Sequence, residues 1–138
     1  MRVVTFLSAG VLIFTSAFIM KKTKSPSQSL FEHKWTLTKI HSEAGIETVT
    51  ANAFIQFNEE KKSGGGKGGC NNFGSSVTVN GNMISFRNIV STKMFCEGMQ
   101  QTENVFFKQL GVVNHFEIKG KILLLFHDKE LFLELEAE

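Results

Sequence analysis

The sequence predicts a mainly β protein: a small antiparallel β-barrel, closed or cracked, of about seven to eight strands with one α-helix. Apolar and polar residues alternate through much of the chain after residue 30, which is typical of strands. Turn signals separate these runs, and a single segment has helical spacing. Because so many short strands cannot all leave their edges exposed, ring closure is favoured, and a two-sheet sandwich is the competing architecture.

The first 20 residues have the composition of a secretory signal peptide. A charged start precedes an apolar stretch from Val3 to Met20, and three lysines follow by residue 24. Thr15 and Ala17 provide the small side chains that a signal-peptidase site requires. An uncleaved membrane anchor is the alternative, because about 18 helical residues span about 27 Å, close to the hydrocarbon thickness of a bilayer.

Residues 21–30 follow as a polar linker that contains three serines and the one proline of the chain. The folded domain is then predicted over residues 31–138. No cysteine precedes Cys70, so the acylated cysteine of a lipoprotein, which must follow the apolar run directly, is excluded. We expect an exported protein of the periplasm or cell envelope, membrane-bound only through an uncleaved N-terminal anchor.

Two hairpins are predicted from turn chemistry. Alternation begins at Trp35, and a second short strand covers residues 54–57. Asn80-Gly81 lies between two apolar alternating runs and predicts a hairpin with a type I′ turn. Lys119-Gly120 predicts the second hairpin, and residues 131–136 alternate once more as the strand that closes the sheet.

The one predicted helix precedes the second hairpin in the sequence. Met99, Thr102, Phe106 and Leu110 recur every three or four residues, and Gly111 follows as a C′ stop. By contrast, the run Gly64 to Gly69 fits the dinucleotide pattern G-x-G-x-x-G only formally, because no helix follows it. We expect a flexible hairpin loop there, and no phosphate site.

Cys70 and Cys96 are the only cysteines in the sequence. An even number in a chain with an export signal predicts a disulfide between them, which closes a loop of about 27 residues. Two alternatives stay open. One is a cysteine nucleophile, which needs a base that the sequence does not place beside either sulfur. The other is a zinc site with two histidines, although the close ligand pairs typical of such sites are absent.

Charge and motif content exclude further classes. Fifteen basic residues balance thirteen acidic ones for a net charge of +2, so a nucleic-acid partner is not expected. Glu59 and Glu60 are adjacent, and adjacent side chains on a strand would point to opposite sides, so they could not face each other across a cleft as a hydrolytic pair must. We therefore interpret this segment as a solvated turn. We predict no catalytic residue, cofactor or metal.

Three short elements carry a family resemblance. They are Trp35, the segment Gly66-Lys67-Gly68-Gly69-Cys70-Asn71-Asn72-Phe73, and the segment Thr92-Lys93-Met94-Phe95-Cys96. Together with Glu103-x-x-Phe106-x-x-x-Leu110, they resemble the META domain of HslJ-like proteins over residues 31–135. The motif residues are Trp35, Gly69, Cys70, Asn71, Phe73, Thr92, Met94 and Cys96.

This resemblance implies a compact β-barrel with one helix in bacterial envelope proteins linked to heat shock and drug tolerance, with no established catalytic activity. It also implies similarity to a secretin pilot protein whose cracked barrel holds lipid. We therefore expect a monomeric, non-enzymatic envelope protein with a binding, structural or stress-response role and an unidentified envelope partner. The alternative is a carrier whose barrel takes a lipid or another hydrophobic ligand. A weaker third class is an envelope hydrolase.

Overall fold

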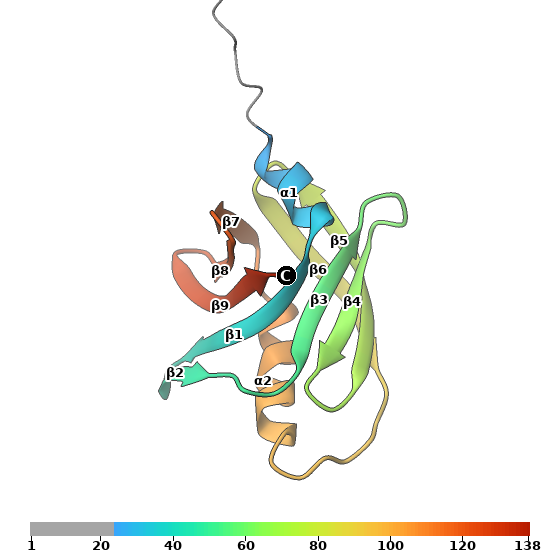
Figure 1. The fold of residues 1–138 in the computed structure, drawn as a ribbon, viewed down its shortest axis with the longest axis vertical. Coiled ribbons are helices and arrows are strands. Elements are labelled where there is room, and N and C mark those ends of the chain that lie inside the picture. Colours follow the sequence, from blue (N-terminus) through green and yellow to red (C-terminus); the bar gives the residue numbers. More distant parts are fainter. Residues whose placement is uncertain (1–23) are drawn as a thin grey trace, which may run out of the picture.

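The computed structural model describes residues 24–138, so the predicted signal peptide or anchor of residues 1–20 lies outside the described residues. Two helices and nine strands follow one another along the described chain (Figure 1). Their bounds are α1 Pro26–Glu32, β1 Lys34–Ser42, β2 Gly45–Thr48, β3 Ala53–Asn58, β4 Ser63–Gly68, β5 Asn72–Asn80, β6 Met83–Ser91, α2 Gln100–Leu110, β7 His115–Lys119, β8 Ile122–His127 and β9 Glu130–Ala137.

The strands form one antiparallel sheet that closes into a ring, which confirms the predicted fold class. The sheet order is β2-β1-β3-β4-β5-β6-β7-β8-β9, and a further pairing of β1 with β9 closes the ring. Among the described strands, β2 pairs with β1 alone and lies outside the ring. The ring is uneven, because β6 and β7 meet at the single residue pair Met83 and His115.

Helix α2 packs against β4, β6 and β9. Its Gln109 donates a side-chain hydrogen bond to the carbonyl of His41 at the end of β1 (2.6 Å), and Thr102 bonds to Glu47 of β2 (2.7 Å). The helix therefore ties together strands on both sides of the weak β6–β7 seam. In Figure 1, α1 lies at one end of the molecule and the segment that leads into α2 lies at the other.

The interior of the ring is filled by large apolar side chains. Trp35, Phe106 and Phe116 are fully buried, together with leucines of β1, β8, β9 and both helices. The indole Nε1 of Trp35 donates to the carbonyl of Leu30 at 2.9 Å, so its polar atom is satisfied inside the core. Burial of each such side chain contributes about 1.5–3 kcal/mol.

The structure differs from the sequence prediction at the start of the domain. Residues 26–32 form helix α1, where a polar linker to residue 30 and a single helix in the whole domain were expected. Leu30 is fully buried, and the ring of Phe31 packs edge-on against Phe57 of β3 at 6.5 Å. Two of the three serines that indicate a linker, Ser27 and Ser29, lie on this helix, and its apolar residues cover one end of the ring.

The glycine run is a strand and not the predicted flexible loop. Gly64 to Gly68 belong to β4, which pairs with β3 and β5 along its length. A Cβ on Gly65 would lie 2.7 Å from the carbonyl oxygen of Phe73, and a Cβ on Gly66 would overlap the carbonyl oxygen of Phe54. The absence of side chains therefore lets the neighbouring strands approach closely.

Two turn predictions are correct in place and wrong in detail. The β5–β6 hairpin pairs Asn80 with Met83, so Gly81 and Asn82 are the central turn residues. Only Gly81 has a positive φ, +60°, which is the pattern of a type II′ turn and not of type I′. Gly111 does follow α2, but its φ of −69° is right-handed, so it is not a left-handed C′ stop.

Candidate functional site

The two motif segments that contain the cysteines, residues 66–73 and residues 92–96, meet at one place in the fold. The turn between β4 and β5 carries Cys70, and the segment of residues 92–99, which links β6 to α2, carries Cys96. A disulfide joins them with the Cα atoms 5.7 Å apart, which confirms the predicted pairing. Cys70 is buried and Cys96 is half-buried. We call residues 69–71, residues 92–99 and Glu103 the motif junction.

The side-chain amide of Asn71 holds the 92–99 segment through hydrogen bonds to Thr92 and Met94. Its Oδ1 accepts hydrogen bonds from Thr92 Oγ1 (2.8 Å) and from the backbone N–H of Met94 (2.7 Å). Its Nδ2 donates to the Met94 carbonyl (3.1 Å) and to Glu103 Oε1 (2.6 Å). Two acceptor positions and two donor hydrogens are all in use, so this asparagine is fully satisfied.

Glu103 is a buried acid in the first turn of α2, with 2% of its surface exposed. Its Oε2 accepts from the backbone N–H groups of Cys70 (3.0 Å) and Asn71 (2.6 Å). The positive end of the α2 dipole further favours a carboxylate here. Among the described residues no ion pair involves this carboxylate.

A hollow of about 240 Å³ lies beside the motif junction. It is lined by residues 91–95, by Asn71, and by four residues of α2: Gln100, Glu103, Asn104 and Phe107. Phe95 at its rim is 81% exposed, and Met94 and Met99 on the same segment are exposed as well. An apolar segment is thus displayed to solvent at a point where covalent and hydrogen-bonded contacts fix the backbone.

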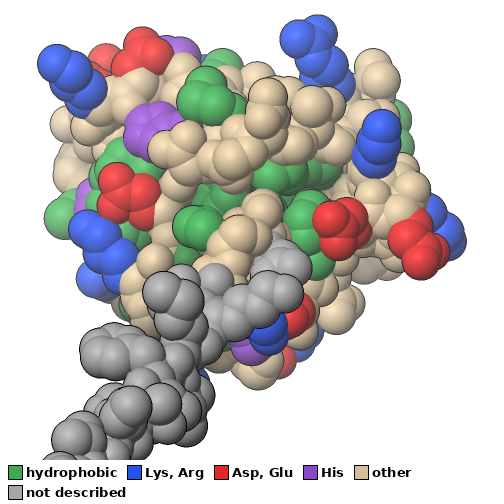
Figure 2. Space-filling model, turned by 90° about the horizontal axis from the view of Figure 1, so that it is seen from above, with side chains coloured by type: hydrophobic (Ala, Val, Ile, Leu, Met, Phe, Trp, Pro, Cys, Tyr) green, Lys and Arg blue, Asp and Glu red, His purple; other side chains and the backbone are tan. Residues whose placement is uncertain are grey.

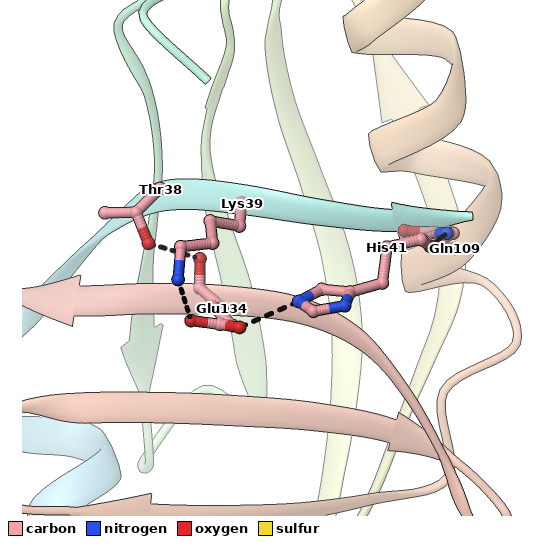
Figure 3. A network of polar contacts seen from close by, with 5 residues as sticks. All are labelled: Thr38, Lys39, His41, Gln109 and Glu134. Carbon is pink, nitrogen blue, oxygen red and sulfur yellow. Dashed lines mark hydrogen bonds and ion pairs between the residues drawn. The ribbon is translucent and has the colours of Figure 1, made fainter. Parts of the chain in front are cut away.

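A second polar cluster lies on the outer face of β1 and β9 (Figure 3). The Glu134 carboxylate bonds His41 Nε2 at 2.7 Å and Lys39 Nζ at 3.2 Å, and its backbone carbonyl accepts from Thr38. Burial raises the pKa of Glu134, but the hydrogen bonds and charges of His41 and Lys39 outweigh it and hold the pKa below its ordinary value. Gln109 of α2 donates to the backbone carbonyl of His41, and its buried Oε1 has no hydrogen-bond partner within the described part of the chain.

A larger hollow, about 400 Å³, lies at the opposite end of the molecule. Phe31 of α1 and Val77 and Val79 of β5 provide its apolar wall, and the β3–β4 and β5–β6 turns form the polar rim. Figure 2 views this end, where hydrophobic side chains show between polar and charged ones. The motif residues do not reach this hollow.

The described residues bear on the two alternatives predicted for the cysteines. Both cysteine sulfurs are used in the disulfide, so neither is available as a thiolate nucleophile or zinc ligand in this state. In residues 24–138 no three His, Cys, Asp or Glu side chains gather as a metal site would require. No helix in that range has the length and apolar content needed to cross a bilayer.

Comparison with known proteins identifies the family. The family model of the META domain matches residues 28–138. The chain belongs to the META-domain family. No curated protein sequence matches it.

Solved structures share the META-domain fold at low sequence identity. An NMR structure of a protein from Burkholderia xenovorans has a TM-score of 0.68 at 16% identity, and the match covers 99% of each chain. A second NMR structure has a TM-score of 0.62 at 19% identity, covering 83% of this chain and 96% of the other. The crystal structure of a DUF4847 family protein from Bacteroides vulgatus ATCC 8482 has a TM-score of 0.56 at 12% identity, covering 81% and 96%.

The predicted motif residues of this META domain divide into two groups. Gly69, Cys70, Asn71, Thr92, Met94 and Cys96 come together at the motif junction. Trp35 lies in the core instead, and Phe73 packs against Phe106 and Phe107 of α2, with ring centroids 5.8 and 5.0 Å away.

The acceptor role of Glu103 and the exposure of Phe95 were missed at the sequence level. Glu103 precedes Phe106 by three positions and Leu110 by seven, so helical spacing places it on the buried face. No comparable signal in the sequence indicates that Phe95 is exposed.

Proposed function

We propose that this META-domain protein is exported to the cell envelope and acts there by binding a partner, in a structural or stress-response role, without catalysing a reaction. One observation carries the proposal. Phe95 is 81% exposed on a segment that a disulfide and the Asn71 amide hold in place. Exposed aromatic side chains of this kind are typical anchors of protein interfaces.

Rigidity of the segment supports binding. A surface that is ordered before contact avoids the entropy cost of ordering loops and side chains on association, so more of the contact energy appears as affinity. The Cys70–Cys96 disulfide constrains the backbone on one side of Phe95, and the hydrogen bonds of Asn71 to Met94 constrain it on the other. Such a clamp suits a recognition surface better than a loop that closes over a substrate.

Export is supported by the disulfide. Disulfides persist in oxidising, exported compartments and are rare where thiols are kept reduced. The signal-like composition of residues 1–20 points to the same route. A location in the periplasm or elsewhere in the envelope is part of the proposal.

The carrier hypothesis has no specific observation in its favour. The ring interior is filled by Trp35, Phe106 and Phe116 and by leucine side chains, each almost wholly buried. The two hollows described above lie at the surface and have polar groups in their linings. Carriage of a lipid in the barrel would require these core side chains to move apart.

Site-specific photo-crosslinking in the native host tests the proposal. A photoreactive amino acid at position 95 should give a discrete crosslinked adduct in the envelope fraction. The matched control replaces Ile46 on β2, which is 66% exposed at a different site, and should give none. Equal labelling at the two positions, or no adduct at position 95, would contradict a binding role for the motif junction.

A further inference from the structure

We propose that the hollow beside the motif junction binds an organic cation, an ammonium or guanidinium group on a short apolar stem. This inference rests on the proposed binding function and specifies the chemistry of the partner. The group comes either from a lysine or arginine side chain of a partner protein or from a small free amine. Charge, aromatic lining and amide lining all favour it.

The charge argument concerns Glu103. Its carboxylate is 2% exposed, lines the hollow, and has three N–H donors but no cation among the described residues. A carboxylate has about four acceptor positions. Within residues 24–138, Oε1 accepts only from Asn71 Nδ2, so these residues leave one acceptor position on that atom unused. A buried negative charge without a paired cation attracts one to the nearest accessible space, which here is the hollow.

The aromatic argument concerns the walls. Phe95 and Phe107 both line the hollow, and Met94 lies beside them. Aromatic faces attract ammonium and guanidinium groups through the ring quadrupole, and they also cover the apolar stem that carries such a group. An anion gains nothing from these rings and is repelled by Glu103, so cations are selected.

The amide argument concerns the first turns of α2. Gln100 and Asn104 are four residues apart, so they lie on the same helix face, and both line the hollow. The Gln100 side chain donates to the Met94 carbonyl at 3.2 Å, which directs its Nε2 toward the segment. The amide oxygens of this pair provide neutral acceptors for the remaining N–H groups of a cation.

One cation of the protein itself lines the same hollow. Lys93 is exposed, and its Nζ lies 3.3 Å from Ser91 Oγ, with no ion pair to Glu103. Its positive charge opposes the entry of another cation. Removal of this charge should therefore strengthen binding, which gives a gain-of-affinity test that a misfolded variant cannot imitate.

The experiment is a ¹H–¹⁵N NMR titration of the whole exported chain with Nα-acetyl-lysine N-methylamide. The matched control is Nα-acetyl-norleucine N-methylamide, which keeps the apolar stem and lacks the ammonium. We expect saturable shifts of the Asn71, Met94 and Gln100 amides, with binding at least about fivefold weaker for the norleucine compound. Equal affinities for the two compounds, or no shifts at these amides, would overturn the proposal.

Variants and a second probe sharpen the result. Phe95→Ala should weaken lysine-amide binding by about threefold and Lys93→Gln should strengthen it by about twofold, whereas Ile46→Ala should change nothing. Both rim side chains are exposed, so neither change threatens the fold. The opposite order of affinities for Phe95→Ala and Lys93→Gln would also overturn the proposal.

Titration with n-butylammonium separates the two sources of the cation. Affinity equal to that of the lysine amide indicates a small amine, and much weaker affinity indicates a lysine side chain in a peptide. Each result supports the cation site. A crosslink at position 95 without amine binding would remove this inference alone, and amine binding without a crosslink would remove the proposed function alone.

Discussion

Removal of the Cys70–Cys96 disulfide should lower the stability of the domain by an amount that the sequence separation of 26 residues determines. In the chain-entropy model a closed loop of this size contributes about 3.5 kcal/mol at 25 °C. For a domain of this length, that corresponds to a fall in Tm of about 10–20 °C. The perturbation is the set Cys70→Ala, Cys96→Ala and the double variant.

The two single variants should differ slightly. Cys70 is 4% exposed and Cys96 is half-buried, so Cys70→Ala loses additional core packing of about 1 kcal/mol. Either change alone removes the loop constraint, so the double variant should lose little more than Cys70→Ala. The expected coupling free energy between the two positions is about 3.5 kcal/mol, the contribution of the shared loop.

Urea unfolding followed by the fluorescence of Trp35 provides the assay. This residue is the only tryptophan and is fully buried, so its emission reports on the whole core. Oxidised protein and protein in reductant should be compared for every variant, since reductant should affect only the wild type. Additive losses in the double variant, or a wild type insensitive to reductant, would refute the reasoning.

Three further predictions concern other parts of the chain. Gly68→Ala should lower the free energy of unfolding by about 1–3 kcal/mol, because its Cβ would lie 2.6 Å from Phe107 Cζ, whereas Gly74→Ala, with open space around the Cβ, should cost much less in the same urea titration. Glu134→Gln should lower stability by about 0.5–1 kcal/mol near neutral pH. Because the pKa of Glu134 is lower in the folded state than its ordinary value, the difference from wild type should be fully present above the ordinary value. It should vanish as the pH falls through the folded-state pKa, as measured by unfolding from neutral to acid pH. The mass of the exported protein should correspond to cleavage after Ala17, and a mature chain that retains residues 3–14 would contradict it.

Local signals in the sequence were sufficient to predict most strands of the sheet. The positions of the hairpins follow from glycine-containing turns between alternating runs, and α2 follows from its apolar spacing. The disulfide follows from an even cysteine count together with the signal-like composition of residues 1–20. The predicted type I′ turn at Gly81 was wrong because type I′ and type II′ turns both use glycine and asparagine. The register of the strands alone decides which residues are central.

The β4 strand could not be predicted from the local sequence, because the contacts that require glycine there come from distant parts of the chain. Glycines there are required by the carbonyl oxygens of Phe54 and Phe73 and by the ring of Phe107, which come from three other elements. Helix α1 was missed for a related reason. Its serines resemble a linker, and only the tertiary structure shows that Leu30 is buried and accepts the hydrogen bond of Trp35.

The motif junction was only partly predictable. Sequence alone places Cys70 beside Cys96 through the disulfide, and resemblance marks Asn71 as a motif residue. The hydrogen bonds that join them need the structure, because the Asn71 side chain takes its partners from the 92–99 segment and from α2. The exposure of Phe95 depends on which side of this clamp the segment presents to solvent.

The central claim is that the motif junction holds the exposed apolar side chains of the 92–99 segment rigidly for a partner. Backbone ¹⁵N relaxation of Phe95 tests it most directly, in oxidised protein and after reduction of the disulfide. The account predicts an order parameter of about 0.85 in the oxidised protein, falling below about 0.6 when the disulfide is reduced while β5 stays ordered. An order parameter already below about 0.6 in the oxidised protein, or one unchanged by reduction, would contradict the claim.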